Sequence, residues 1–318
     1  MKAIYYNGAT YAYRTDYPKP VRTPGHSLIK ILAAALCNTD REILKGYRPA
    51  FRGVMGHEFV GIVEDSDRKE LIGKRVVGEL NEGCGHCVYC KSGREKHCPD
   101  RKVIGMEGLD GCFAEYMVLA DHLLHPVPDA LETKTALFAE PLAAALEIPS
   151  MCHIDPAANA CIIGDGRLAL MIAQVIRLTG INLTILGKHP EKLRLFEPCG
   201  KTLLTETALK RAAQNPEETY EIVIDATGSP TGLLTAANLV RKRGTIIIKS
   251  TYAAQIQLDM SYFVVNEITI KGSRCGPFEP ALSLLQKNLI QLPEITFYDI
   301  ADFDSLLNAQ VFKAGIIF

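Results

Sequence analysis

Two short runs, GVMGHEFVG at residues 53–61 and CGHCVYCKSGREKHC at residues 84–98, decide how this chain of 318 residues is organised. The second run places four cysteines within fifteen residues. Four thiolates at such spacing can surround one tetrahedral ion and leave no coordination position open, which is typical of a structural zinc site. The run therefore predicts a structural zinc lobe at about residues 80–100. Its ligands are Cys84, Cys87, Cys90 and Cys98.

Other uses of the clustered cysteines fit less well. The dipeptide Cys98-Pro99 is similar to the end of a ferredoxin motif, but three residues separate the last two cysteines there and seven separate them here. Disulfides would suit a secreted protein, yet the opening run Met1–Tyr6 lacks the apolar core and cleavage site of a signal peptide. In a reducing compartment such a cluster favours metal ligation, so zinc is the expected metal.

Length and charge exclude several classes of protein. The chain exceeds what one hydrophobic core usually serves, so two domains are expected. With 35 basic and 36 acidic residues, nothing favours binding to nucleic acid or to an anionic membrane. The longest apolar runs are too short or too interrupted to cross a bilayer. We therefore expect a soluble, cytoplasmic protein.

The pattern of apolar residues predicts an α/β protein with two different domains. Short alternating segments separated by Gly and Pro run through residues 1–148 and indicate a mostly β, barrel-like domain. From about residue 160 strand-like and helix-like segments alternate, which is typical of a doubly wound parallel sheet, and this domain is placed at residues 149–274. The remainder, residues 275–318, is expected to return to the first domain.

A glycine-rich turn predicts a dinucleotide site in the second domain. The run Gly164-Asp165-Gly166-Arg167-Leu168-Ala169 follows an apolar strand and opens a helix, as in the motif G-x-G-x-x-G/A. Gly164 allows a tight turn, and Gly166 lets the backbone approach a pyrophosphate. The amino end of the helix then offers free N–H groups to the phosphates.

The end of the next predicted strand bears on the choice of coenzyme. A carboxylate at this point usually receives the adenosine ribose of NAD, whereas Gly187, Lys188 and His189 occur here. A missing carboxylate beside a cation suits a 2′-phosphate, so the sequence predicts NADP in preference to NAD. The alternative is that Lys188 and Lys192 are solvated residues at the start of a helix.

The order of the motifs resembles one family. Cys37-Asn38-Thr39-Asp40, the runs at 53–61 and 84–98, Glu140-Pro141-Leu142 and the glycine-rich turn follow one another as in the zinc-dependent medium-chain dehydrogenases, closest to their polyol and threonine dehydrogenase branch. The resemblance implies a GroES-like catalytic domain and a Rossmann domain. It also implies hydride transfer between NADP(H) or NAD(H) and a secondary alcohol, a polyol or the corresponding ketone.

The resemblance further implies a second, catalytic zinc. Cys37 and His57 are similar to its ligands, and Glu58 or Glu140 would complete the set; which of the two coordinates stays open. Asp40 is similar to the carboxylate that fixes the tautomer of the ligand histidine. A dinucleotide-binding sensor without activity, or a zinc-free quinone reductase, would not require this set of residues.

Further roles follow from the same resemblance. Thr39 is similar to the hydroxyl that accepts the substrate proton. Glu42 stands near the place where many relatives have a relay histidine, so either Glu42 relays protons or the relay ends in water. The segment Leu258–Ile270 is expected to form strand and to pair subunits into a homodimer or homotetramer. Residues at later strand ends are expected to contact the coenzyme. They are Ala226, Thr227, Ser250, Thr251, Ser273 and Cys275.

Overall fold

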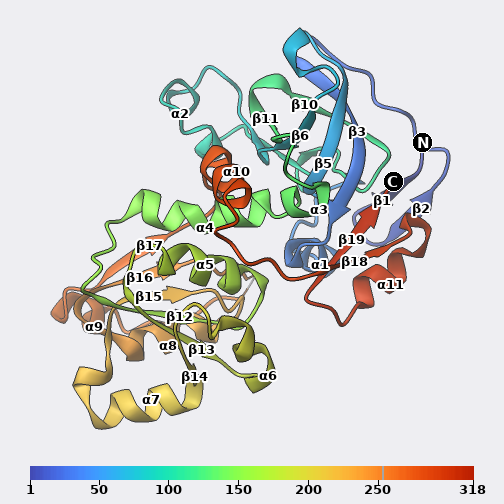
Figure 1. Cartoon of the computed structure of the whole chain (residues 1–318). Helices are drawn as coiled ribbons and strands as arrows, with labels where there is room; N and C mark the ends of the chain where they lie inside the picture. Colours follow the sequence, from blue (N-terminus) through green and yellow to red (C-terminus); the bar gives the residue numbers. More distant parts are fainter. Residues whose placement is uncertain (253) are drawn as a thin grey trace. The chain divides into compact units, whose positions relative to one another are not determined.

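The computed structural model describes residues 1–252 and 254–318 and divides into two units (Figure 1). The first unit contains Met1–Glu140 together with Phe278–Phe318, and the second contains Pro141–Pro277. The helix α4 (Ala139–Met151) is continuous through Pro149, so the change of pattern near this proline is not the boundary of an element. The division between the units falls near the start of the helix instead.

The first unit is built from three sheets. The largest has the order β11-β6-β5-β3-β19-β18, with β10 paired to β3, and two small sheets have the orders β2-β1-β4 and β7-β8-β9. This mixed, mainly antiparallel arrangement is the mostly β domain that the sequence predicts. The strands are β1 (Ala3–Tyr6), β2 (Tyr11–Arg14), β3 (His26–Ala35), β4 (Gly53–Val54), β5 (Glu58–Asp65), β6 (Arg75–Gly78), β7 (Asn81–Glu82), β8 (Lys102–Ile104), β9 (Gly108–Leu109), β10 (Tyr116–Ala120), β11 (Leu124–Pro126), β18 (Ile295–Tyr298) and β19 (Lys313–Ile317).

The helices of the first unit are short and connect the strands. The α-helices are α1 (Asn38–Leu44), α2 (Val88–Lys91), α3 (Thr133–Ala136), α10 (Phe278–Gln286) and α11 (Phe303–Asn308). Single 3₁₀ turns are η1 (Lys69–Leu71), η2 (Glu95–His97), η3 (Asp121–Leu123) and η6 (Ile300–Asp302). None of the helices in the described part of the chain combines the length and the apolar character that a bilayer crossing requires.

The last strand, β19, joins the end of the chain to the sheet of the amino-terminal half (Figure 1). Gly315 pairs antiparallel with Ala35 of β3, and Ala35 pairs on its other side with Glu58 of β5. The run of alanines at the end of β3 is fully buried, and its small side chains let neighbouring elements approach closely. The register therefore brings β19 near the strand that begins with Glu58.

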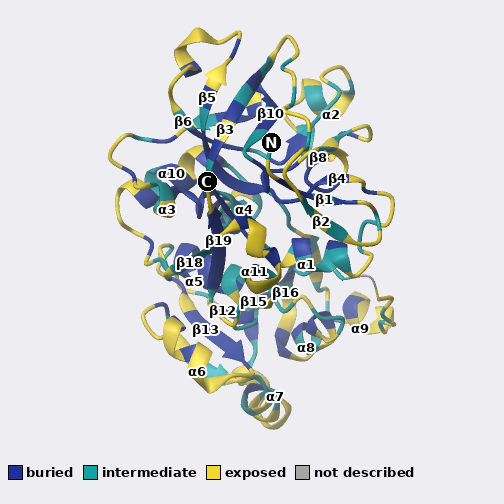
Figure 2. Ribbon diagram, turned by 90° about the vertical axis from the view of Figure 1, so that its right-hand side faces the viewer, coloured by how far each residue is buried: buried dark blue, intermediate teal, exposed yellow. Residues whose placement is uncertain are grey.

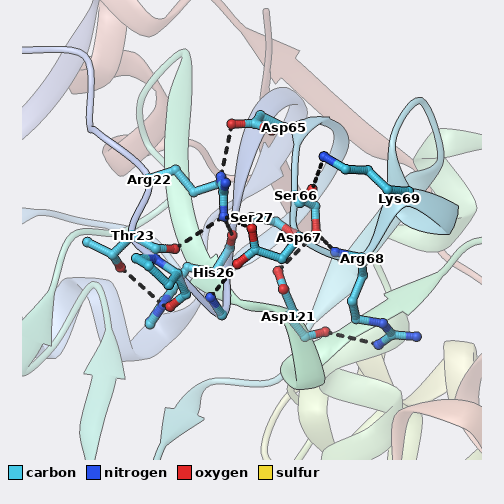
Figure 3. A network of polar contacts seen from close by, with 12 residues as sticks. Arg22, Thr23, His26, Ser27, Asp65, Ser66, Asp67, Arg68, Lys69 and Asp121 are labelled. Carbon is cyan, nitrogen blue, oxygen red and sulfur yellow. Dashed lines mark hydrogen bonds and ion pairs between the residues drawn. The ribbon is translucent and has the colours of Figure 1, made fainter.

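A buried polar contact ties three parts of the first unit together (Figure 3). Oδ1 of Asp121 accepts hydrogen bonds from the hydroxyls of Ser27, at 2.6 Å, and Ser66, at 3.2 Å. Both serines are fully buried, and Asp121 is 6% exposed. Closer to the surface, Nε of Arg22 lies 2.9 Å from Oδ2 of Asp65. The carboxylate thus links β3, the end of β5 and η3.

Replacing Asp121 with alanine should lower the free energy of unfolding by about 2–4 kcal/mol, because two buried hydroxyls lose their acceptor. Urea denaturation of the purified protein measures this change. Glu294, an exposed acid before β18, offers the matched control, and its replacement with alanine should leave the stability nearly unchanged. Equal stability of the Asp121 variant and the control would contradict the role assigned to this carboxylate.

The second unit is a six-stranded parallel sheet with helices packed against it (Figure 1). Its order is β14-β13-β12-β15-β16-β17, so the chain winds outward in both directions from β12, as the sequence predicts for a doubly wound sheet. In Figure 2 the central strands β12, β13 and β15 are mostly buried, whereas α6 and α7 show an exposed face. The elements are β12 (Asn159–Ile163), α5 (Arg167–Arg177), β13 (Asn182–Gly187), α6 (Pro190–Leu193), η4 (Arg194–Phe196), β14 (Lys201–Leu204), α7 (Thr205–Gln214), η5 (Pro216–Glu218), β15 (Tyr220–Asp225), α8 (Thr231–Leu239), β16 (Val240–Ile248), α9 (Met260–Val265) and β17 (Thr269–Gly272).

One expectation for the second unit is wrong. The segment Leu258–Ile270 does not form a continuous strand, because it contains the helix α9 and only the start of β17. The side chain of Asp259 accepts a hydrogen bond from the N–H of Ser261 and thereby begins the helix. An aspartate at this position favours the start of a helix. This capping preference outweighs the tendency of the following apolar residues to form a strand.

Candidate metal and coenzyme sites

The start of α1 positions Cys37 and Asp40. Cys37 has an extended backbone and is the N-cap residue of the helix. Its N–H donates to Oδ2 of Asp40 at 2.8 Å, so the carboxylate closes the first turn. Asp40 is fully buried, and the partial positive charge at the amino end of the helix stabilises the carboxylate. This turn therefore holds a thiol and a buried carboxylate side by side.

A glycine turn brings His57 to the same place. Gly56 has a φ of +92°, and a Cβ atom there would lie 2.6 Å from the ring of Phe113, so only glycine fits without a shift. His57 is 2% exposed, and its Nδ1 lies 3.3 Å from Oδ1 of Asp40. Burial lowers the pKa of His57, but the charges of Asp40 and Cys37 outweigh burial and raise that pKa well above its usual value.

Cys37, His57 and Glu58 form a cluster whose ligand atoms all lie within 4.8 Å of one another. Sulfur, nitrogen and oxygen donors in this combination suit zinc. Among the described residues, Oδ1 of Asp40 and Nδ1 of His57 are buried atoms without a well-formed hydrogen bond. An ion on the other ring nitrogen would keep a proton on Nδ1 and direct it toward Asp40. The cluster therefore fits a zinc ion.

Lys313 lies against Glu58, a contact that the sequence analysis missed. Nζ of Lys313 is hydrogen-bonded to Oε2 of Glu58, and the two side chains are 3% and 2% exposed. The ammonium also lies 6.0 Å from the centre of the Phe138 ring. Since a buried carboxylate needs a compensating charge, Lys313 provides one from the last strand. A lysine at the head of the apolar run KAGII, residues 313–317, is the sequence signal for this role.

Glu140 occupies the first turn of α4. Over residues 1–252 and 254–318, the cluster of mutually close ligand atoms contains Cys37, His57 and Glu58 but not Glu140. The structure thus brings together three of the four predicted ligands of the catalytic metal. Coordination by Glu140 stays a prediction.

Thr39 and Glu42 lie on α1 but face different surroundings. Oγ1 of Thr39 is 3.7 Å from Sγ of Cys37, which places this hydroxyl beside the cluster. Glu42 pairs with Lys45 at 2.9 Å, and its side chain is 38% exposed. The hydroxyl therefore lies next to a ligand of the cluster, whereas the carboxylate is engaged in a surface ion pair.

The four cysteines of the lobe form a second cluster, and their sulfur atoms also lie within 4.8 Å of one another. The N–H of Cys90 lowers the pKa of Cys87 to about 7, while desolvation raises the pKa of Cys90 to about 12. Cys87 is the N-cap residue of α2, and its Sγ accepts a hydrogen bond from the N–H of Cys90. Four thiols without another ligand suit a closed zinc site.

The glycine-rich turn in the second unit has the shape that a pyrophosphate requires. Gly164 has a φ of +131°, and a Cβ atom there would lie 2.7 Å from the carbonyl oxygen of Ala226. A Cβ atom on Gly166 would meet nothing within 4 Å, so this backbone is open to a ligand. Gly166 is also the N-cap residue of α5, whose first N–H groups have no partner within the helix. The turn therefore fits a dinucleotide.

Asp165, the middle residue of that turn, has partners that the sequence did not reveal. Its Oδ2 accepts hydrogen bonds from the N–H of Lys188 at 2.8 Å and the N–H of His189 at 2.9 Å. Nδ1 of His189 lies 2.9 Å from the same oxygen. A Cβ atom on Gly187 would lie 2.8 Å from this oxygen. A carboxylate is therefore present at the end of β13, although residue 187 is glycine.

The ends of β15, β16 and β17 are joined by polar contacts. Oδ1 of Asp225 accepts hydrogen bonds from the hydroxyls of Thr227, at 2.8 Å, and Ser250, at 2.9 Å. Nζ of Lys249 donates to Oγ of Ser273 at 3.1 Å, and Lys249 is 7% exposed. Thr227, Ser250 and Ser273 are therefore engaged in bonds that shape this edge of the sheet.

The other residues predicted to bind the coenzyme lie at the same edge of the second unit or in the helices next to it. Ala226 donates its N–H to Ile163 at 2.9 Å and so connects two strand ends. Arg167 and Leu168 begin α5, and Lys192 is exposed on α6. Thr251 is exposed beyond β16, and Cys275 is half-buried beyond β17.

A mixed β unit that carries a thiol, an imidazole and a carboxylate in one cluster, together with a doubly wound sheet, defines a nicotinamide-dependent dehydrogenase. Two family models match the chain: the alcohol dehydrogenase GroES-like domain over residues 23–129, and the zinc-binding dehydrogenase over residues 168–287. The chain belongs to the zinc-dependent medium-chain dehydrogenases of the alcohol dehydrogenase superfamily.

Individual relatives show how far the similarity extends. An L-threonine 3-dehydrogenase of Streptomyces avermitilis is 32% identical, with 81% of this chain and 79% of the relative covered. An erythritol/L-threitol dehydrogenase of Mycolicibacterium smegmatis is 27% identical, with 93% and 89% covered. A crystal structure of an Escherichia coli CFT073 alcohol dehydrogenase complexed with NADH has a TM-score of 0.89 and 25% identity, with 100% of this chain and 99% of that chain covered.

A second solved structure contains the phosphorylated coenzyme. It is a Sinorhizobium meliloti protein described as a zinc-binding dehydrogenase and bound to NADP, with a TM-score of 0.90, 25% identity, and 100% and 99% of the two chains covered. Similar folds thus occur with either coenzyme. The fold by itself does not choose between NAD and NADP.

Proposed function

We propose that this chain is a zinc-dependent dehydrogenase that transfers a hydride between a nicotinamide coenzyme and a secondary alcohol or polyol, or the corresponding ketone. The observation that carries the proposal is the cluster of Cys37, His57 and Glu58, with Asp40 behind the histidine. The relatives named as polyol and threonine dehydrogenases support this substrate class, because their substrates carry a secondary hydroxyl group.

Cys37 and His57 would hold a catalytic zinc, with Glu58 or Glu140 as the third protein ligand. A zinc ion held by these residues would supply Lewis-acid chemistry that favours the negatively charged form of an alcohol oxygen. Thr39 Oγ1, which lies beside Cys37, would accept the hydroxyl proton of the substrate and release its own hydroxyl proton toward solvent. Asp40 keeps the proton of His57 on Nδ1, and Lys313 compensates the charge of Glu58.

The carboxylate of Glu42 would release to solvent the proton that leaves the substrate through Thr39. This exposed carboxylate lies one helical turn beyond Thr39 and already pairs with Lys45. A carboxylate in contact with water can exchange protons without a specialised partner. This assignment extends the function of Thr39 and takes the place of the histidine relay that many relatives have.

The lobe would hold a second, structural zinc through Cys84, Cys87, Cys90 and Cys98. A closed tetrahedral site does no chemistry, but it would stabilise a lobe whose strand and helical turns are only two to four residues long. The proposed enzyme therefore carries two zinc ions per chain, one at each of the two clusters.

The sequence predicts NADP in preference to NAD, and one premise of that prediction does not hold in the structure. It rested on the missing carboxylate at Gly187 and on the cation of Lys188. The lysine is exposed, as the argument requires. The carboxylate of Asp165, however, lies beside Gly187.

We also propose that the protein assembles as a homodimer or homotetramer through the outer edge of the second unit. Exposed apolar side chains gather on α9, where Met260 is 58%, Val264 72% and Val265 79% exposed. Within residues 1–252 and 254–318, the neighbouring strand β17 is the last strand of its sheet, and the outer side of such an edge strand can pair with another chain. An apolar patch next to a free strand edge is typical of a subunit interface.

Zinc content per chain tests the proposed function. Elemental analysis is expected to find two zinc ions in the wild-type protein and one in the Cys37→Ser variant, because the lobe does not depend on Cys37. The matched control is Cys152→Ser, a half-buried cysteine outside both clusters, which should keep both ions. Reduction of a nicotinamide coenzyme by secondary alcohols or polyols should accompany the loaded wild-type protein and be lost in Cys37→Ser.

A single ion in wild type and Cys37→Ser alike would contradict the proposal, because only the lobe would then be loaded. Such a result would favour a dinucleotide-binding sensor or a zinc-free quinone reductase. Turnover of quinones with a reduced coenzyme separates these two classes.

A further inference from the structure

We infer that Asp165 fills the anion-binding position at the carboxyl end of β13 and thereby makes the coenzyme site select NAD(H) over NADP(H). The inference rests on the proposed function, since it concerns the coenzyme of that reaction. It assigns a specificity-determining role to a residue that the dinucleotide motif leaves unspecified, the second position of G-x-G-x-x-A.

Three donors converge on one oxygen of Asp165. They are the N–H groups of Lys188 and His189 and the ring nitrogen Nδ1 of His189, at 2.8 to 2.9 Å from Oδ2. Two consecutive backbone N–H groups together with an imidazole are donors that a phosphate group would use. In this protein the carboxylate already occupies them. A 2′-phosphate could take these donors only by displacing Asp165.

The position of the carboxylate matches the place where a dinucleotide fold usually has its ribose-binding acid. That acid ordinarily stands at the end of the second strand, the place of Gly187 in this chain. A Cβ atom on Gly187 would lie 2.8 Å from both Cβ and Oδ2 of Asp165, so the two positions cannot both carry a side chain without a shift. The glycine at 187 and the acid at 165 are therefore a matched pair, and the acid comes from the neighbouring turn.

The charge state of Asp165 favours a neutral ribose. Burial raises the pKa of this carboxyl, but hydrogen bonds from His189 and Lys188 outweigh burial and lower the pKa below its usual value. The group is therefore ionised at neutral pH. A 2′-phosphate would bring further negative charge against it, whereas a 2′-hydroxyl can donate a hydrogen bond to a carboxylate.

One oxygen of Asp165 is available for such a contact. Within residues 1–252 and 254–318, Oδ1 accepts no hydrogen bond, and the side chain is 14% exposed. Oδ2 meanwhile keeps the ring of His189 in a fixed orientation. Asp165 therefore has one oxygen that organises the turn and one that can receive a ribose hydroxyl.

Dissociation constants of NADH and NADPH, measured by titration calorimetry without substrate, test the inference. The wild-type protein should bind NADH at least about 10-fold more tightly than NADPH, as expected for one hydrogen bond to a charged group. Asp165→Ser frees the three donors and removes the charge, so the ratio of the two constants should shift by about 10- to 100-fold toward NADPH. Asp165→Asn keeps the size of the side chain and should shift the ratio in the same direction.

The matched control is Glu191→Gln, which changes the charge of an exposed acid on the adjacent helix α6. It should leave the ratio within about twofold of wild type, because an exposed charge is screened by solvent. Tighter binding of NADPH by the wild-type protein, or an unchanged ratio in both Asp165 variants, would overturn the inference and leave the proposed function standing. Failure of the wild-type protein to bind either coenzyme would overturn both.

Discussion

His57→Ala is expected to lower kcat/KM for oxidation of a secondary alcohol at least about 10³-fold, equivalent to about 4 kcal/mol of transition-state stabilisation. Loss of a residue that only orients a metal ligand typically lowers metal affinity or activity 10- to 100-fold, and loss of the ligand itself should lower the activity further. His57 is 2% exposed and lies in the cluster with Cys37 and Glu58, and this cluster holds no second imidazole from the described residues. Steady-state kinetics and zinc analysis on the same preparation measure the effect.

Two variants separate a specific effect of His57 from a general one. His153→Ala removes an exposed histidine outside both clusters and should leave kcat/KM and the zinc content unchanged. Asp40→Asn should reduce kcat/KM by about 10- to 100-fold, because it acts through the orientation of His57. If His57→Ala retained two zinc ions and more than a tenth of the wild-type activity, the cluster would not be the catalytic metal site.

Lys313→Met is expected to lower the free energy of unfolding of the zinc-depleted protein by about 3–5 kcal/mol, because it leaves the buried carboxylate of Glu58 without a partner. The double variant Lys313→Met with Glu58→Gln removes both charges and should recover most of this loss in stability. The stability changes caused by two substitutions are not additive when the two residues are in direct contact. Denaturant unfolding of the single and double variants, carried out with a chelator, measures the coupling between the two side chains.

A surface ion pair provides the control for Lys313. Lys210 contacts Glu206 at 2.6 Å on α7, and both side chains are largely exposed. Lys210→Met should leave the stability of the protein within experimental error, since solvent screens exposed pairs. Equal effects of Lys313→Met and Lys210→Met would show that the buried pair contributes no more than a surface pair.

The ordered motifs of the sequence predicted most of the first unit's site. The spacing of the four cysteines is local, and neighbouring residues on a short loop cannot lie far apart, so the lobe could be predicted directly. Cys37 and His57 are 20 residues apart in numbering, and the resemblance to a family was needed to connect them. The structure places them together because β3 and β5 are neighbours in one sheet.

Elements with weak local signals were missed or wrongly assigned. The short strand β14 and the helix α7 have few buried residues, so the apolar pattern that identifies an element is faint there. In Leu258–Ile270, an apolar run suggested a strand, but the N-cap of α9 at Asp259 begins a helix. Short apolar segments are compatible with either structure until capping is considered.

The sequence by itself determined the class of fold, both candidate metal clusters and the glycine-rich turn, because each is encoded by the spacing of nearby residues or by an ordered set of motifs. Only the tertiary structure decided the partners of the buried charges. Lys313 meets Glu58 across 255 positions because β19 joins the sheet of the first half, and Asp165 meets His189 across 24 positions because β12 and β13 lie side by side. Such contacts depend on strand order and register, which no local pattern in a single sequence specifies.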